Sequence, residues 1–214
     1  EENYSDLIKT DYFPNRILEK YINPLLASNS KVALIVLDCL RYDQARVILE
    51  RLYSDFEVKI NPALSFLPTS TQYSRNAIFS GLFPDEIEDS FPKEWELMNA
   101  DLTNLNKYEE CFFNEYLKNN FNRKISTHYE KIIEFDHGIK LLNKIKEYKD
   151  IDVISLVVNF IDILGHAFSN SKVVKEIIPN EVYYRKEVKN WFENSWLYET
   201  LLEFKKENRK IIIT

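Results

Sequence analysis

The stretch VALIVLD, residues 32–38, decides the fold, because it is an unbroken apolar run that ends in a carboxylate. A second apolar run, VISLVV, occupies residues 153–158. Continuous runs of this kind are typical of parallel strands that are buried on both faces of a sheet. We therefore predict an α/β fold in which a mainly parallel sheet carries helices on both faces.

Apolar residues around the two runs recur at spacings that favour further helices and strands. The predicted helices cover residues 17–26, 45–52, 72–80, 139–145 and 183–204. Further strands are predicted at residues 56–64, 124–129 and 210–214, whereas residues 84–106 show no clear period and stay unassigned. We divide the chain into a helical lead-in segment, residues 1–30, and a partial domain, residues 31–214.

Composition excludes several classes of protein. The 214 residues carry a net charge of −6, which argues against a protein that binds nucleic acid through a basic face. Only three glycines are present, so the chain has no glycine-rich phosphate loop. The chain has two cysteines and no apolar stretch near the roughly 18 residues of a membrane span, which indicates a cytoplasmic protein. The first residue is Glu1 rather than methionine, so we interpret the chain as a piece of a longer protein.

Three polar residues follow the two apolar runs. Asp38 ends the first run, and Asp162 and His166 come shortly after the second. Ligand sites in open α/β sheets lie beyond the carboxyl ends of the strands, so all three residues are candidates for chemistry. Asp162 and His166 are four residues apart, which places them on one face of a helical turn. Asp38 is explained equally well by a local role, as a helix N-cap or an acceptor in the turn after the strand, or as a ligand of Zn²⁺, Mn²⁺ or Mg²⁺.

Thr71 is the candidate nucleophile. We predict it as the N-cap of the helix over residues 72–80, with Gly81 just past the helix end. Capping is the common role of such a threonine, but the N–H groups and the dipole at a helix N-terminus also favour an alkoxide and a phosphate oxygen. A metal or a base is still needed to activate the hydroxyl, and Thr69 is a competing nucleophile.

Other polar residues carry less weight in the sequence. Arg75 and Arg41 are interpreted either as ligands of a substrate phosphate or as structural arginines. His128 and His137 stand in polar surroundings, so we predict that both are solvated. Cys39, next to the first carboxylate, is predicted to be a small buried residue rather than a metal ligand.

Three segments carry a resemblance to a known family. They are LDCLRYDQ at residues 37–44, LPTSTQYSRNAIFSG at residues 67–81 and NFIDILGH at residues 159–166. Together they resemble the PglZ branch of the alkaline phosphatase superfamily, and in particular the PglZ effector domain of PorX-type response regulators. The resemblance covers nearly the whole chain and implies an alkaline phosphatase-like fold.

The resemblance implies a hydrolase that uses two divalent metal ions, with zinc ahead of manganese or magnesium. Asp38 and Thr71 would belong to one metal site, and Asp162 and His166 to the other. The family pattern P-T-x-T places the reactive hydroxyl on the second threonine, which is Thr71 here. In the family, the strand that corresponds to residues 210–214 runs into an Asp-His pair that completes a metal site. We therefore expect a chain truncated before that pair and poorly active as this piece alone.

The resemblance also implies a biological setting. PorX-type proteins join an N-terminal receiver domain to this effector, work with a histidine kinase in type IX protein secretion, and cleave phosphodiesters in oligonucleotides. We therefore predict a metal-dependent phosphodiesterase that acts on oligonucleotide-type substrates, and we allow for a homodimer. Two alternatives stay open: a non-catalytic interaction module of the same fold, and a phosphomonoesterase or sulfatase.

Overall fold

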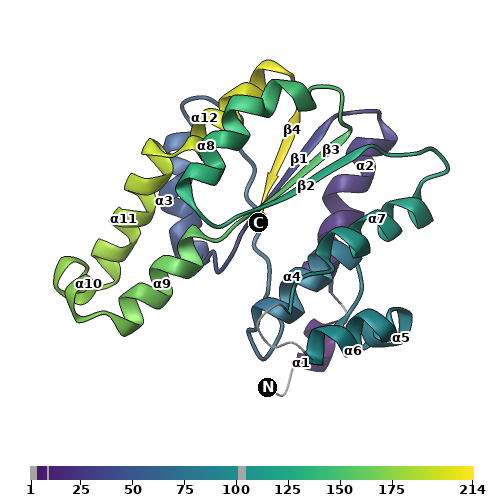
Figure 1. The fold of residues 1–214 in the computed structure, drawn as a ribbon, viewed down its shortest axis with the longest axis horizontal. Helices are drawn as coiled ribbons and strands as arrows, with labels where there is room; N and C mark the ends of the chain where they lie inside the picture. The colour runs from purple at the N-terminus through teal and green to yellow at the C-terminus, as the bar shows by residue number, and fades with distance from the viewer. Residues whose placement is uncertain (1–3, 9, 101–104) are drawn as a thin grey trace. The chain divides into compact units, whose positions relative to one another are not determined.

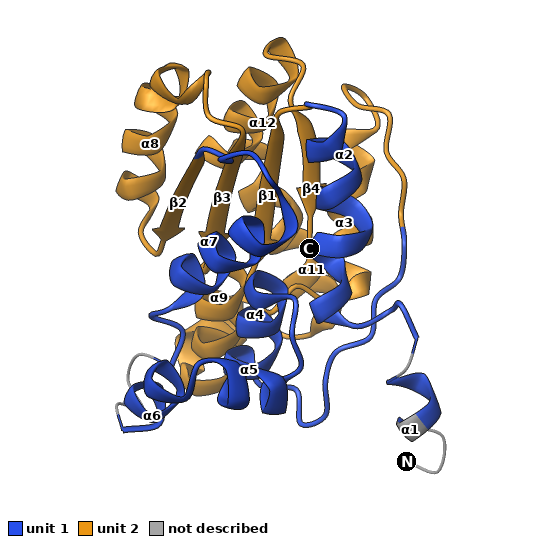
Figure 2. Cartoon of the chain, turned by 90° about the vertical axis from the view of Figure 1, so that its right-hand side faces the viewer, with its two compact units in different colours: residues 1–29, 61–126 blue, residues 30–60, 127–214 orange. Residues whose placement is uncertain are grey.

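The computed structural model describes residues 4–8, 10–100 and 105–214, and the chain forms two compact units (Figures 1 and 2). The first unit comprises residues 1–29 and 61–126, and the second comprises residues 30–60 and 127–214. Each unit is therefore assembled from two separate segments of the chain. Residues 1–29 share a unit with residues 61–126, and the division into a lead-in segment and one domain stays a prediction.

The second unit is built on a sheet with the strand order β2 (Thr127–Ile132), β3 (Val153–Val158), β1 (Val32–Leu37), β4 (Lys210–Ile213). Every neighbouring pair of strands is parallel. Leu37 pairs with Val158, so β1 and β3 end together at one edge of the sheet. The predicted parallel sheet is confirmed, and its two central strands are the two apolar runs.

Both faces of the two central strands are buried. Ala33 and Ile35 of β1 pack with Leu156 of β3 in the hydrophobic core of the second unit. Successive strand residues point to opposite faces of a sheet, so Val32 and Leu34 belong to the other face, where both are fully buried. Burial on both faces explains why these strands read as continuous apolar runs rather than as alternating patterns.

Helices of the second unit cover one side of this sheet (Figure 1). They are α3 (Tyr42–Leu52), α8 (Phe135–Lys144), α9 (Phe160–Asn170), α10 (Lys172–Ile177), α11 (Glu181–Asn194) and α12 (Trp196–Lys206), with a 3-10 helix, η3 (Ile145–Tyr148), after α8. Helix α3 packs against α11, and α8 packs against α12. Ile48, Leu141, Val188 and Leu201 join these helices to the core of the sheet.

Every regular element in the described part of the first unit is a helix, and loops such as residues 61–70 connect these helices. The unit's elements are α1 (Tyr4–Leu7), a 3-10 helix η1 (Pro14–Arg16), a π-helix η2 (Leu18–Ile22), α2 (Asn23–Ala27), α4 (Thr71–Ser80), α5 (Pro84–Ser90), α6 (Pro92–Ala100) and α7 (Glu109–Asn120). Helix α4 packs against both α7 and η1. The helix that begins with Thr71 therefore lies at the centre of this unit's packing.

The strand predicted at residues 124–129 begins three residues later, and the helix predicted at residues 17–26 is the π-helix η2 followed by α2. Two further predicted elements are contradicted by the structure. The strand predicted at residues 56–64 is wrong, because these residues form neither strand nor helix. Pro62 has no N–H for a strand ladder, and Ile60 and Leu64 are each 40% exposed, so the segment lacks a buried face. The helix predicted over residues 183–204 is two helices, α11 and α12. Ser195 between them is buried and has an extended backbone with ψ of 158°, which interrupts the helical hydrogen bonds.

Residues 84–106, which the sequence left unassigned, contain the short helices α5 and α6. Each of these helices begins with a proline, Pro84 or Pro92, a residue that favours the first position of a helix. The N–H of Phe83 donates to Oε2 of Glu86 at 2.7 Å, which closes the start of α5. Proline followed two residues later by glutamate was thus the sequence signal for both helices. Residues 101–104 lie outside the described residues.

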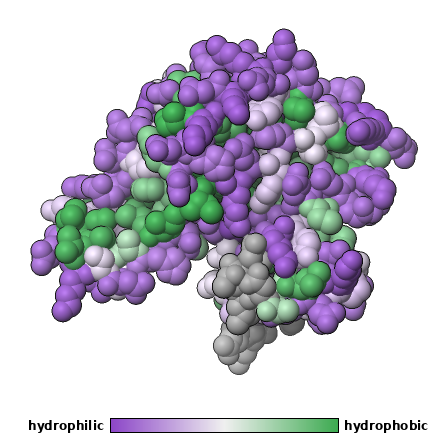
Figure 3. All heavy atoms as spheres, viewed as in Figure 1, coloured by the Kyte–Doolittle hydropathy of each residue, from purple (hydrophilic) through white to green (hydrophobic). Residues whose placement is uncertain are grey.

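Hydrophobic side chains gather on the surface over α9 and α10 (Figure 3). Ile163 is 44% exposed, Val173 66% and Ile177 64%. Exposed apolar patches of this kind commonly mark contact surfaces. None of the helices in the described ranges combines the length and the apolar content that a membrane span requires.

Candidate active site

Asp38 lies directly after β1 at the carboxyl edge of the sheet. It is 5% exposed, and its backbone N–H donates to the carbonyl of Val158 at 3.0 Å, which extends the pairing of β1 with β3. The predicted position of Asp38 at a strand-to-helix junction is confirmed. Its alternative role as a helix N-cap is wrong, because Arg41 occupies the N-cap position of α3. Asp38 therefore does not cap α3, and its two other interpretations, an acceptor in the turn after the strand and a metal ligand, stay predictions.

Cys39 makes the turn that follows Asp38. Its φ of 63° lies in the left-handed region, and the next residue closes the turn with a hydrogen bond from the N–H of Leu40 to the carbonyl of Leu37 at 3.1 Å. The prediction that Cys39 is buried is wrong, because the turn places it beyond the strand, where it is exposed. Its Sγ donates to Oδ1 of Asp162 at 3.1 Å. The turn after β1 therefore contacts the first turn of α9.

Asp162 and His166 lie on the same face of α9, as predicted. Nε2 of His166 is 3.5 Å from Oδ1 of Asp162, which is an ion-pair distance rather than a hydrogen bond. The side chain of His166 is 74% exposed and that of Asp162 is 24% exposed, so solvent reaches both. A metal ion with bonds of about 2.0–2.2 Å to each ligand fits between two atoms at this separation.

Thr71 is the first residue of α4. The predicted N-cap position is wrong by one residue, because Ser70 is the N-cap, with an extended backbone at φ −119° and ψ 132°. The N–H of Ser74 donates to the carbonyl of Ser70 at 3.1 Å, so the helix starts one residue before the expected place. Gly81 caps the other end with φ of 72°, as predicted. The hydroxyl of Thr71 still lies in the first turn, where the helix dipole favours negative charge.

Arg75, a candidate ligand of the substrate, is buried in the first unit. Its Nε donates to Oε1 of Glu109 at 2.8 Å, and its Nη2 donates to Oε2 at 2.6 Å. Arg75 is 4% exposed and Glu109 is fully buried. This geometry fits the structural role that the sequence left open for Arg75, because the guanidinium already pairs with a carboxylate that joins α7 to α4.

Asn159 is a further candidate for the site, although its place in the sequence did not single it out. Asn159 follows Val158 at the end of β3, and Asp38 follows Leu37 at the end of β1. Because Leu37 and Val158 pair, Asn159 and Asp38 leave the sheet side by side. The side-chain oxygen of Asn159 is buried and has no hydrogen-bond partner among the described residues. Asn159 is the N-cap of α9, yet its side chain does not cap that helix. By contrast, Asn180 at the N-cap of α11 accepts from two backbone N–H groups.

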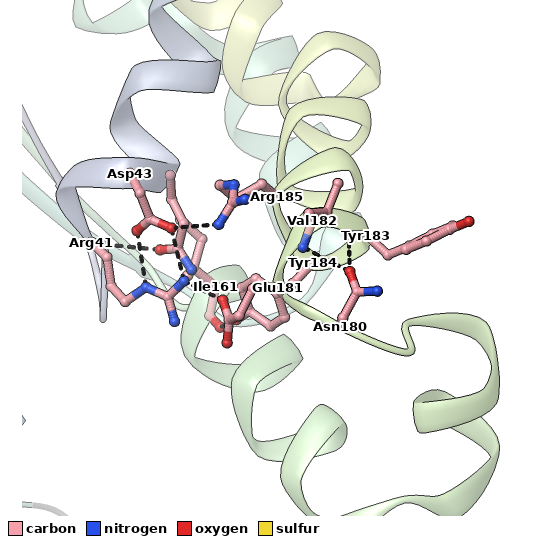
Figure 4. Close-up of polar contacts among 10 residues, drawn as sticks. Arg41, Asp43, Ile161, Asn180, Glu181, Val182, Tyr183, Tyr184 and Arg185 are labelled. Atoms are coloured by element: carbon pink, nitrogen blue, oxygen red, sulfur yellow. Dashed lines mark hydrogen bonds and ion pairs between the residues drawn. The ribbon is translucent and has the colours of Figure 1, made fainter.

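Charged residues join the starts of α3 and α11 (Figure 4). The guanidinium of Arg41 donates to both oxygens of Asp43, at 3.1 and 3.0 Å, and to Glu181. Arg185 donates to Asp43 at 3.1 Å. The hydrogen bonds from Arg41 lower the pKa of Asp43 despite its partial burial. Arg41 therefore has a structural role in this geometry, in agreement with one of the two interpretations from the sequence.

His128 and His137 are not simply solvated, which corrects the prediction. Nε2 of His128 lies 2.9 Å from one oxygen of Glu130, and Nε2 of His137 lies 2.8 Å from the other. The ring of His128 also stacks on Tyr148, with 3.9 Å between the ring centres. His128 and Glu130 are two residues apart on β2, so they share one face of the strand, which a sequence alone can indicate. Because the carboxyl group of Glu130 contacts His137 of α8 as well as His128 of its own strand, it links β2 to the start of α8.

The residues at the carboxyl ends of β1 and β3 fit a metal ion in their chemistry. Carboxylate, amide and imidazole groups are ligands for zinc, manganese and magnesium. Asp162 and His166 offer two groups of this kind close together, and the buried side-chain oxygen of Asn159 offers a third. Within the described ranges, no three histidine, cysteine or acidic side chains group closely enough to hold a metal. Thr71 belongs to the other compact unit, so its approach to Asp38 stays a prediction.

These features define the class of the protein: a parallel α/β sheet with its polar site beyond the strand ends, as in phosphoesterase-type folds. A family model described as the BREX system PglZ alkaline phosphatase-like domain matches residues 17–213. The chain belongs to this family. The resemblance to PglZ domains and the alkaline phosphatase-like fold are therefore confirmed, whereas the setting in a PorX-type regulator stays a prediction. A search of curated proteins found no match.

Proposed function

We propose that the protein is a metal-dependent hydrolase of phosphodiesters, with Thr71 as the nucleophile and Asp38, Asp162 and His166 as metal ligands. The observation that carries this proposal is the match to an alkaline phosphatase-like family over residues 17–213. The positions of the three ligands beyond β1 and β3 support it, because α/β enzymes place their sites at this edge. A divalent cation, when bound, supplies positive charge that stabilises an alkoxide and the phosphate oxygens.

In the proposed reaction, Oγ of Thr71 attacks the phosphorus of a phosphodiester. The bond from Oγ to phosphorus forms while the bond from phosphorus to the leaving oxygen breaks, and the hydroxyl proton ends on the leaving alcohol. Water then attacks the phosphothreonine, releases a phosphomonoester and restores the hydroxyl. The N-terminal turn of α4 favours the negative charge that develops beside Thr71. The net charge of −6 makes such local positive potential necessary for a phosphate substrate.

The finer part of the proposal concerns the substrate and the setting. We propose oligonucleotide-type substrates, zinc ahead of manganese or magnesium, and an output domain of a cytoplasmic response regulator linked to type IX secretion. A receiver domain, a cognate histidine kinase and a homodimer belong to the same proposal. Its support is the resemblance of residues 37–44, 67–81 and 159–166 to PorX-type effector domains. Phosphomonoesters and sulfate esters are the alternative substrates, because they suit the same kind of site.

A second candidate function is a non-catalytic interaction module of the same fold. The exposed Ile163, Val173 and Ile177 on α9 and α10 favour this alternative, because an apolar surface of this kind suits a protein partner. The two functions differ in what they require of Thr71. An interaction module needs no hydroxyl at that position.

Hydrolysis of bis(p-nitrophenyl) phosphate by the intact protein, with added Zn²⁺, Mn²⁺ or Mg²⁺, tests the proposal. We expect Thr71→Ala to lower kcat by at least about 1,000-fold, because the variant loses the nucleophile. Thr69→Ala is the matched control from the same motif, and we expect it to keep nearly the full rate. Wild-type rates in Thr71→Ala would overturn the role of Thr71. An intact protein that hydrolyses no ester with any of the three metals would favour the interaction module.

A further inference from the structure

Tyr184 contacts the turn of α9 that carries Asp162. Its hydroxyl donates a hydrogen bond to the carbonyl of Ile161 at 3.0 Å, and Tyr184 itself is 5% exposed (Figure 4). Burial raises the pKa of this phenol, so the hydroxyl keeps the proton that it donates. The bond joins α11 to the first turn of α9 in the interior of the second unit.

Further contacts place Tyr184 along one face of α9. The ring of Phe168 meets the ring of Tyr184 edge to face, with 5.6 Å between the ring centres. A Cβ atom at Gly165 would lie 3.3 Å from the Tyr184 hydroxyl, so glycine gives the hydroxyl room at this position. Residues 161, 165 and 168 follow the spacing of one helical face. Tyr184 therefore packs along a face of α9 that neighbours the Asp162–His166 face.

The position of Tyr184 is itself fixed by the charged residues at the starts of α3 and α11. The guanidinium carbon of Arg41 lies 5.7 Å from the centre of the Tyr184 ring. Arg41 pairs with Glu181, and Arg185, the residue after Tyr184, pairs with Asp43. The same turn of α11 thus contacts both α3, which follows β1, and α9, which follows β3.

The contact of Tyr184 with α9 has a counterpart on the turn after β1. There, Sγ of Cys39 lies 3.1 Å from Oδ1 of Asp162. The first turn of α9 is therefore held at two points: a backbone carbonyl on Tyr184, and a carboxylate on Cys39. The two contacts involve neighbouring residues of α9, Ile161 and Asp162, so together they restrain the first turn of this helix.

We propose that Tyr184 is a positioning residue, whose hydrogen bond to Ile161 orients α9 so that Asp162 and His166 face the end of β1. The inference rests on the proposed function, in which these two residues bind the catalytic cation. Residues outside the ligand set that orient ligands commonly change metal affinity by about 10–100-fold when they are replaced. Tyr184 never touches the substrate or the cation in this role.

The test compares Tyr184→Phe, which loses only the hydroxyl, with Tyr183→Phe in the intact protein. Tyr183 is the matched control, because it precedes Tyr184 on α11 and its side chain is 45% exposed. Hydrogen exchange without metal should be faster at the backbone amides of residues 163–166 in Tyr184→Phe, and unchanged in Tyr183→Phe. Calorimetric titration with Zn²⁺ should show about tenfold weaker binding in Tyr184→Phe. The melting temperature without metal should stay close to that of the wild type.

The two readouts separate the possible failures. Unchanged exchange at residues 163–166 in Tyr184→Phe would overturn the positioning role. Asp162→Asn serves as the reference for the ligand assignment, and we expect it to bind Zn²⁺ much more weakly than the wild type. If exchange is faster in Tyr184→Phe, but Tyr184→Phe and Asp162→Asn both bind Zn²⁺ like the wild type, the role of Tyr184 in positioning α9 is supported. The ligand assignment within the proposed function is then overturned.

Discussion

Arg75 and Glu109 form a two-point ion pair in the interior of the first unit, with donor-to-acceptor distances of 2.8 and 2.6 Å. The pair joins α4 to α7, and α4 begins with Thr71. A buried charge that loses its partner is strongly destabilising, whereas replacement of both partners by apolar residues is often tolerated. The ion pair therefore ties the position of the candidate nucleophile to the stability of the unit.

We expect Glu109→Gln to lower the free energy of unfolding by about 3–5 kcal/mol, because it removes the negative charge that both hydrogen bonds of the buried Arg75 guanidinium reach. The double variant Arg75→Met/Glu109→Leu should be more stable than Glu109→Gln. Urea unfolding measures both effects. The control is Glu19→Gln, which removes an exposed pair with Arg16 and should change stability by less than about 1 kcal/mol. A loss of similar size in Glu109→Gln and Glu19→Gln would contradict the prediction.

Asn159→Leu should weaken cation binding without weakening the fold. A buried amide oxygen with no partner costs free energy, so an apolar residue of similar size should leave the metal-free protein as stable as the wild type or more so. We expect the side-chain oxygen of Asn159 to add a ligand to the proposed Asp38, Asp162 and His166, so titration of Asn159→Leu with Mn²⁺ should show weaker binding. Asn180→Ala is the control: it should lower stability by about 0.5–2 kcal/mol through loss of a cap and leave Mn²⁺ binding unchanged. Wild-type affinity in Asn159→Leu would exclude Asn159 as a ligand.

Glu130 should make stability depend on pH in the acidic range. The hydrogen bond from His128 lowers the pKa of Glu130, with His137 adding to the effect. A carboxyl whose pKa is lower in the folded state contributes stability above its unfolded value of about 4.5, and this contribution is lost as the pH falls through the folded value. The difference in unfolding free energy between wild type and Glu130→Gln should therefore be largest near neutral pH and shrink below about pH 4.5. An exposed control, Glu176→Gln, should show no such trend.

Gly138→Ala should destabilise the protein, although alanine in a helix is usually favoured over glycine by about 0.5–1 kcal/mol. A Cβ atom at Gly138 would lie 1.9 Å from the ring of Trp196, which is 3% exposed and begins α12. Relief of such an overlap in a packed core costs about 1–3 kcal/mol and outweighs the helical gain. Gly165→Ala, with a nearest contact of 3.3 Å, should cost less. Thermal unfolding compares the two, and a stabilised Gly138→Ala would show that α8 and α12 can separate.

The parts of the fold that the sequence predicts are those set by local pattern. The apolar runs of β1 and β3 are continuous because both faces of each strand are buried. The end of each run marks the carboxyl end of its strand, and this is where Asp38 and the Asp162–His166 pair follow. Residues 56–64 have the alternation of a strand, but alternation alone does not provide a partner strand. In residues 84–106 each helix is too short for a clear period, and proline at the first position was the more useful signal.

The parts of the site that the sequence did not predict depend on packing between distant segments. The contact of Cys39 with Asp162 joins the turn after β1 to a helix after β3. The hydrogen bond from Tyr184 to Ile161 requires α11 to pack on α9. The side-chain oxygen of Asn159 is buried and does not cap α9, which is recognised only once the hydrogen bonds of the structure are known. No spacing along the chain encodes these three relationships.

The interleaving of the two compact units has a consequence for synthesis of the protein. The central strand β1 pairs with β3 and β4, which leave the ribosome much later, at residues 153–158 and 210–213. Pairing between segments so distant in the chain is slow, because the intervening loop must close first. Until then, the apolar strand is open to pairing with other nascent chains. Slower synthesis at low temperature, or extra chaperone, should therefore raise the yield of folded protein. Substitutions on the surface of the folded protein should raise it less.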